Sequence, residues 1–334
     1  IAGRLKLSEI QQKHVRRIAE LSKFDLETQL VQEFPELQGL MGENYAMLKN
    51  EEAIVCRGIR QHYYPRNTKD FLPEDVESVP VAIADKLDLL TTAFSLNMIP
   101  SGAADPYALR RTAQGITQLI LGLRLPLDLH ELINASVRLL DDQQDLALDR
   151  TKLQNDLLDF LLQRQRWFLQ ERGIRYDLID AVLKTSAGFK PTQGKTARSV
   201  LAIEQLSFAD FLGEHLETDM FKRSVEAIVR AANISSKYAN RIAEALNESA
   251  LELEEEKTFL AALKPILNSD SQALWSPDNY LQQLLELEPV VTRFFEDVMV
   301  MDEDPVKCGN RLWLCHQLAQ WSGRHLDLQS IVFA

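Results

Sequence analysis

The chain has 334 residues, of which 46% are hydrophobic, and a formal net charge of −12. This hydrophobic content is enough to build folded cores and excludes wholesale disorder. Three cysteines are too few for a disulfide scaffold and fit a reducing compartment. No run of 18 or more apolar residues marks a membrane-spanning helix.

The negative charge is unevenly distributed along the chain. Residues 1–240 carry 30 Lys and Arg against 33 Asp and Glu, whereas residues 241–334 carry 7 against 16. Inside 160–200 the sign reverses, with a net charge of +5. The global charge argues against a protein coated in basic patches, but it does not exclude local contacts with nucleic acid.

Helical periodicity dominates the sequence. In residues 79–97, Ile83, Leu87, Leu90 and Phe94 follow an i, i+4, i+7, i+11 spacing and form one apolar stripe. No Asn-Gly or Asp-Gly turn occurs, and alternating strand patterns are scarce. We therefore predict an all-α, multi-domain helical array. Its further helices are expected over 8–23, 36–48, 105–122, 128–141, 149–172, 216–235, 241–267, 279–300 and 305–321.

The motifs that could indicate catalysis are weak. Gly194-Lys195-Thr196 has the wrong spacing from Gly188 for a phosphate-binding loop. Cys308 and Cys315, seven residues apart on a helix, lie about 10.5 Å apart along its axis and cannot share one zinc ion. We expect no catalytic residue and no metal site.

Several arginines are candidates for anion binding. Asp105-Pro106 predicts a helix start, which places Arg110 and Arg111 near the positive end of the helix dipole. An anion should lie close by, and a carboxylate and a phosphate are equally acceptable. Arg164 is expected at the edge of a core.

Short segments spread over the chain match one known family together and in order. They are 22–39 (SKFDLETQLVQEFPELQG), 84–88 (ADKLD), 99–111 (IPSGAADPYALRR), 175–182 (RYDLIDAV), 230–234 (RAANI), 294–304 (FFEDVMVMDED) and 310–312 (NRL). These segments resemble the β subunit of the bacterial heterotetrameric glycyl-tRNA synthetase.

The resemblance implies the C-terminal half of such a subunit in three parts: an HD-like helical domain (1–125), a helical body with the basic stretch 160–200 (126–217), and an anticodon-binding domain of the arginyl-synthetase type (218–334). It implies tRNA(Gly) and an α subunit as partners in a cytoplasmic α2β2 tetramer. The α subunit would use ATP and Mg. The fragment alone would have no cofactor, no membrane contact and no catalysis, although it would belong to a ligase.

The HD pattern is incomplete. Phe24-Asp25 stands where an HD enzyme has His-Asp, and Asp85 matches the distant aspartate. Without that imidazole the site lacks a metal ligand, and the spacings of His14 and His62 do not allow them to replace it. We predict a degenerate HD domain that is reused to bind RNA.

The predicted RNA contacts are arginines and lysines in all three parts. For Arg230 and Arg311, expected to be buried near Asn233 and Asn310, a structural role is favoured. Two alternatives stay open: an HD phosphohydrolase and a helical interaction module without an RNA role. The full set is Arg110, Arg111, Arg164, Arg166, Arg172, Arg175, Lys190, Lys195, Arg230 and Arg311.

Overall fold

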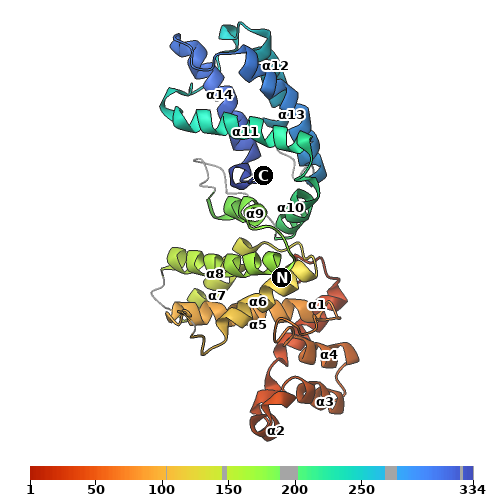
Figure 1. The fold of residues 1–334 in the computed structure, drawn as a ribbon. Helices are drawn as coiled ribbons and strands as arrows, with labels where there is room; N and C mark the ends of the chain where they lie inside the picture. Colours follow the sequence, from red (N-terminus) through yellow and green to blue (C-terminus); the bar gives the residue numbers. More distant parts are fainter. Residues whose placement is uncertain (103, 145–148, 189–201, 268–276, 324–325, 334) are drawn as a thin grey trace. The chain divides into compact units, whose positions relative to one another are not determined.

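A computed structural model describes the chain except for residues 103, 145–148, 189–201, 268–276, 324–325 and 334 (Figure 1). All regular structure in the described part is helical, which confirms the all-α prediction. The chain forms two compact units, unit 1 (Ile1–Arg172 with Ser199–Ile203) and unit 2 (Gly173–Arg198 and Glu204–Ala334). The three parts expected from sequence, with boundaries near 125 and 217, stay a prediction.

Unit 1 is organised around one apolar helix. Helix α5 packs against α1, α4, α6, α7 and α8, and Ile83, Leu87, Leu90 and Phe94 of its predicted stripe are all buried. Phe94 meets Phe160 of α8 edge to face, with ring centroids 5.1 Å apart. The helices of unit 1 are α1 (Glu9–Glu20), α2 (Gln29–Glu33), α3 (Leu40–Leu48), α4 (Ala53–Gln61), α5 (Ser78–Ser95), α6 (Leu109–Gly122), α7 (Leu129–Gln144) and α8 (Arg150–Glu171), with short 3-10 turns η1 (Phe24–Glu27) and η2 (Pro35–Leu37).

Unit 2 is a second helical bundle. Helix α14 packs on α11 and α12, and α13 packs on α11 and α12. At its centre the fully buried Trp321 stacks on Tyr280, with ring centroids 5.2 Å apart. Its elements are α9 (Tyr176–Gly188), α10 (Ala202–His215), α11 (Asp219–Lys237), η3 (Ala239–Arg241), η4 (Glu248–Ala250), α12 (Glu254–Leu267), α13 (Pro277–Asp297), α14 (Pro305–Ser322) and η6 (Leu328–Ser330).

The last residues of the chain close unit 2. Arg175 donates to both carboxylate oxygens of the buried Asp177, at 2.6 Å each, and to the carbonyl of Val332. Asp177 in turn accepts the Val332 amide at 2.8 Å, and the Asp327 amide donates to the carbonyl of Ala181 at 2.8 Å. The start of α9 is therefore fastened to the residues that follow α14.

One predicted helix is shorter than expected. The pattern over 241–267 predicts a continuous helix, but α12 begins only at Glu254. The side chain of Asn310 pairs with the backbone of Asn247 in both directions, at 3.0 and 2.9 Å. The Ala243 amide donates to the carbonyl of Gly309 at 3.2 Å. These tertiary hydrogen bonds replace the helical ones before α12.

A second correction concerns the start of α6. Asp105 was expected to be the N-cap, but α6 begins at Leu109, after Ala108 in the left-handed conformation. The Asp105 carboxylate reaches forward and accepts the amides of Leu109 and Arg110, at 2.8 and 3.0 Å. It therefore satisfies the first amides of α6 from outside the helix.

Candidate functional site

We call the residues predicted to form a degenerate HD site the HD-like centre of unit 1, and in the structure they surround a buried aspartate. Asp25, on η1, is 0% exposed and accepts the Gly39 amide at 2.6 Å and the Tyr63 hydroxyl at 3.0 Å. Gly39 adopts a φ of +80°, and a Cβ there would lie 2.8 Å from the Tyr63 ring. A residue with a Cβ would be strained at this φ and would collide with Tyr63, so glycine is required for the amide to reach Asp25. Phe24, the neighbour of Asp25, packs against the apolar cluster that includes Ile18.

The second carboxylate of the centre is already paired with a cation. Lys23 makes an ion pair with Asp85. Buried His62 directs Nδ1 to the carbonyl of Ile59 at 2.6 Å, while its Nε2 has no partner. Burial lowers the pKa of His62, although the Asp85 carboxylate opposes this shift. The imidazole is therefore held in its neutral form.

A buried lysine completes the centre. Lys86 is 7% exposed and donates to the carbonyls of His62, Tyr63 and Tyr64, at 3.3, 3.4 and 3.0 Å. Burial lowers its pKa to about 8. Its ammonium thus fixes the turn that follows α4.

These residues do not fit a divalent metal of the HD type. A phenylalanine stands in place of the imidazole, Lys23 neutralises Asp85, and two protein donors occupy Asp25. Among the described residues, no group of three or more His, Cys, Asp or Glu side chains could hold a metal ion. The incomplete HD pattern points to Phe24, Asp25 and Asp85 but gives no indication of the roles of Lys23 and Lys86. Both lysines are adjacent in sequence to a position of the HD pattern, because Lys23 precedes Phe24 and Lys86 follows Asp85.

The structure brings two of the predicted arginines of unit 1 together. Arg110 donates to the carbonyls of Gly102 and Ala104, at 2.7 and 3.2 Å. Arg164 of α8 lies over the Phe160 ring, 5.7 Å from its centroid, and its buried Nε has no partner. Burial, and then the positive charge of Arg110, lower the pKa of Arg164, and the Asp105 carboxylate opposes this shift.

Arg111 extends this pair. It is exposed at the start of α6, one residue after Arg110, and forms no ion pair among the described residues. We call Arg110, Arg111 and Arg164 the α6–α8 arginine cluster. The Asp105 carboxylate opposes the lowering of the Arg164 pKa but does not cancel it, so a phosphate bound at the cluster would gain further from these guanidinium groups.

The other predicted contacts of the body segment differ in position. Arg166 is half-buried on α8, and Arg172 is the C-cap of that helix. Arg175 is held by Asp177 and Val332 and fastens α9 to the C-terminal residues. Lys190 and Lys195 lie outside the described residues.

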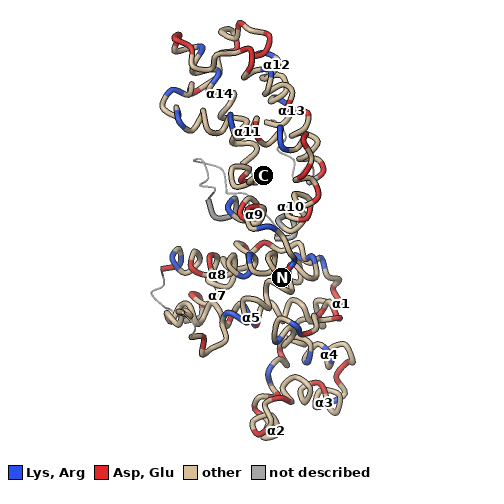
Figure 2. The backbone as a smooth tube through the Cα atoms, in the orientation of Figure 1, with Lys and Arg blue, Asp and Glu red and all other residues tan. Residues whose placement is uncertain are grey.

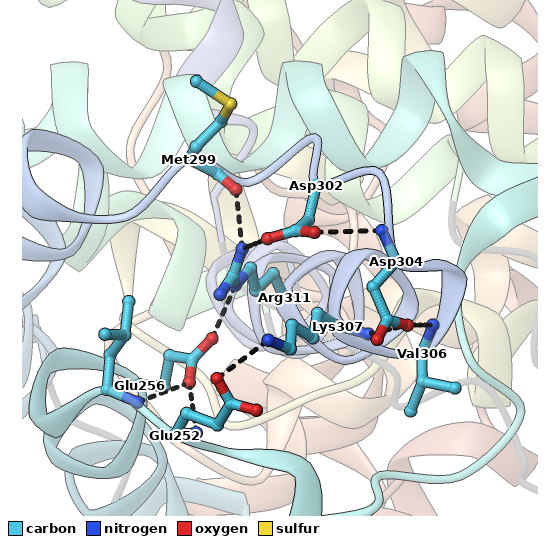
Figure 3. A network of polar contacts seen from close by, with 9 residues as sticks. Glu252, Glu256, Met299, Asp302, Asp304, Val306, Lys307 and Arg311 are labelled. Atoms are coloured by element: carbon cyan, nitrogen blue, oxygen red, sulfur yellow. Dashed lines mark hydrogen bonds and ion pairs between the residues drawn. The ribbon is translucent and has the colours of Figure 1, made fainter.

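Arg311 lies inside a polar network of unit 2 (Figure 3). It is 4% exposed and donates to Glu256 at 2.5 Å, to Asp302 at 2.7 Å and to the carbonyl of Met299 at 2.9 Å. Glu256 also accepts two backbone amides just before α12, at 2.8 and 3.0 Å. The expected burial of Arg311 is confirmed, and its contacts link α14 to α12 and to the residues that follow α13.

Arg230 differs from the expectation. It is exposed on α11, so its predicted burial near Asn233 is wrong. Its guanidinium lies over the ring of Phe295 on α13, 4.5 Å from the centroid. The residue therefore combines a packing contact with access to solvent.

A groove of about 790 Å³ lies in unit 2 between α11, α14 and residues 326–329. Apolar side chains such as Ile228 and Leu328 line it together with Lys184, His316 and Gln320. The Gln320 amide lies 2.8 Å from Nε2 of His316, and burial lowers the pKa of His316. An apolar groove with a few hydrogen-bonding groups can accept an unstacked base.

Two family models match this chain, and the first of them defines the class of its C-terminal part. Residues 225–329 match the family model described as "DALR anticodon binding domain", so this part of the chain is of the anticodon-binding class. Residues 1–184 match the model described as "Glycyl-tRNA synthetase beta subunit". The chain belongs to the glycyl-tRNA synthetase β subunit family, and the sequence-based resemblance is confirmed.

Individual relatives agree with this assignment. The chain is 37% identical over 336 residues to the glycine–tRNA ligase β subunit of Halalkalibacterium halodurans, covering 100% of this chain and 46% of that protein. The corresponding subunit of Halothermothrix orenii is 35% identical, with 99% and 46% covered, and that of Streptococcus pyogenes serotype M49 is 36% identical, with 95% and 43% covered. The chain spans less than half the length of these relatives.

Proposed function

We propose that this chain binds tRNA(Gly) within a glycyl-tRNA synthetase and holds it for glycylation. The observation that carries the proposal is the match of residues 225–329 to an anticodon-binding domain in a chain of the β subunit family. The groove beside α11 adds support, because the bases of an anticodon loop are unstacked and can enter such a groove.

The assembly expected around the chain is part of the same proposal. An α subunit would activate glycine with ATP and Mg, and the two subunits would form an α2β2 tetramer in the cytoplasm. The described helices include none that is long and apolar enough to cross a membrane. Cys56, Cys308 and Cys315 are free and buried, as a reducing compartment allows.

The α6–α8 arginine cluster is the proposed contact for the acceptor arm. Arg110 and Arg164 are close enough to interact electrostatically, and Arg111, the residue after Arg110, is exposed. Contacts of this kind bind phosphates and position the RNA without reading its sequence. The cluster would therefore supply affinity and orientation.

The two alternatives are not favoured. A phosphohydrolase would need a metal, whereas Lys23 and Tyr63 already occupy the carboxylates of the HD-like centre. A helical interaction module without an RNA role does not account for the anticodon-binding domain match.

The test is tRNA(Gly) binding by the complete α–β assembly over a range of salt concentrations. Arg110→Ala with Arg111→Ala should reduce the slope of log affinity against log salt by up to about 2, because each phosphate contact on a duplex contributes about 0.9. The control is Arg4→Ala with Arg57→Ala, which removes two exposed arginines already paired with Glu131 and Asp75. An unchanged slope and acceptor-arm footprint would remove the cluster as a site. Binding that ignores salt would refute the tRNA role itself.

A further inference from the structure

In the part of the acidic unit 2 that the structure describes, ion pairing leaves one group of cations free. Among the described Lys and Arg of this unit, those outside α11 and η3 are paired with carboxylates: Arg175, Lys184, Lys257, Lys264, Arg293, Lys307 and Arg311. Five others form no ion pair within the described part of the unit. These five, which we call the α11 cation set, are Lys222, Arg223, Arg230, Lys237 and Arg241.

The α11 cation set follows one helix and the turn after it (Figure 2). Arg223, Arg230 and Lys237 are spaced by seven residues, which keeps them on nearly the same face and about 10.5 Å apart along the axis. All three are exposed, as is Arg241 in η3. Glu226 is the acidic residue within this stripe, and it pairs with neither Arg223 nor Arg230.

Aromatic rings, in place of carboxylates, support three of these cations. Arg230 lies over Phe295, Lys237 lies 5.4 Å from the centroid of Tyr238, and Lys222 lies 5.8 Å from that of Phe333. A ring restricts a cation without neutralising its charge, so the charge stays available to a ligand. The free face of a stacked guanidinium is also a surface on which a base can stack.

We infer that the α11 cation set binds the sugar–phosphate backbone of the anticodon arm of tRNA. The inference rests on the proposed function and deepens it by naming the surface. A row of unneutralised charges about 21 Å long matches a phosphodiester chain, whose charges also lie in a row. The region 241–334 carries an excess of negative charge that repels RNA, so within the unit the strand is directed to the surface of this helix.

The closing experiment compares two triple variants of the complete α–β assembly with the same loss of charge. Arg223→Gln, Lys237→Gln and Arg241→Gln remove three free cations. Lys257→Gln, Lys264→Gln and Lys307→Gln remove three cations that are paired with Glu254, Glu248 and Glu252. The first variant should lower the slope of log affinity against log salt by about 2, because each single-strand contact contributes about 0.7. The second should leave the slope unchanged.

A third variant, with Arg223→Lys, Lys237→Arg and Arg241→Lys, keeps every charge and should retain the wild-type slope. The footprint of the first variant should lose protection on the anticodon arm and keep it on the acceptor arm.

Equal salt slopes for the first two variants would overturn the inference. In that case, salt-dependent tRNA binding by the wild-type assembly would still support the proposed function. Loss of a protein partner with an unchanged tRNA slope would identify a protein-binding surface and overturn it as well. A wild-type assembly without salt-dependent tRNA binding would overturn both.

Discussion

Removal of the Arg311 guanidinium is expected to destabilise unit 2 strongly. Arg311 and Glu256 are 4% and 1% exposed, and the guanidinium serves three acceptors. Arg311→Ala leaves the Glu256 carboxylate buried with only its two amide donors. Loss of one partner of a buried ion pair costs about 3 to 5 kcal/mol in the free energy of unfolding.

The assay is chemical and thermal unfolding followed by tryptophan emission, to which the fully buried Trp321 of α14 contributes. For a unit of this size each kcal/mol lowers the melting temperature by roughly 2 to 4 °C, so we expect a decrease of roughly 6 to 20 °C. The matched control is Arg293→Ala, which also loses two carboxylate partners but is 71% exposed. Exposed pairs contribute about 0 to 1 kcal/mol, so this variant should unfold near the wild-type midpoint.

The double variant Arg311→Met with Glu256→Gln tests whether the unpaired Glu256 carboxylate causes the loss of stability. Removing both charges removes the uncompensated carboxylate, so the double variant should be more stable than Arg311→Ala. A loss below about 1 kcal/mol for Arg311→Ala, or a double variant as unstable as the single one, would refute the reasoning.

Two further predictions concern the HD-like centre. The pKa of Lys86 is about 8 in the folded protein and that of an unfolded lysine is about 10.4, so the folded form binds fewer protons between these values. From pH 7.5 to 9.5 the free energy of unfolding should therefore rise by about 2 kcal/mol more in the wild type than in Lys86→Met. Urea titrations at the two pH values measure this, and parallel pH dependences would contradict it. Elemental analysis of the purified protein should find no stoichiometric divalent ion. A bound ion together with phosphohydrolase turnover would restore the enzyme alternative.

The fold class and the family follow from features that the sequence carries locally. The stripe of Ile83, Leu87, Leu90 and Phe94 predicts α5 because a helix that packs on several neighbours repeats its apolar residues at helical spacing. The pattern fails over 241–253, where Asn310, more than sixty residues later, holds the backbone of Asn247. Local periodicity contains no information about such a partner.

The candidate site was only partly predictable for the same reason. Sequence motifs pointed to Arg110 and Arg164 separately, but the packing of α6 on α8 that brings them together is a tertiary property. The seven-residue spacing of Arg223, Arg230 and Lys237 was visible in the sequence. That spacing indicates a binding surface only because the other described lysines and arginines of unit 2 are paired with carboxylates, which the structure alone shows.

The hydrogen bonds that join Arg175 and Asp177 to Val332 have a consequence for biosynthesis. A ribosome adds residues in order, so Asp177 of α9 is synthesised 155 residues before Val332. Until then Asp177 lacks the Val332 amide, and the places of Leu326, Leu328 and Ile331 in the core are empty. Unit 2 can therefore complete its fold only after residue 332 has been synthesised, whereas the residues of unit 1 up to Arg172 precede that step.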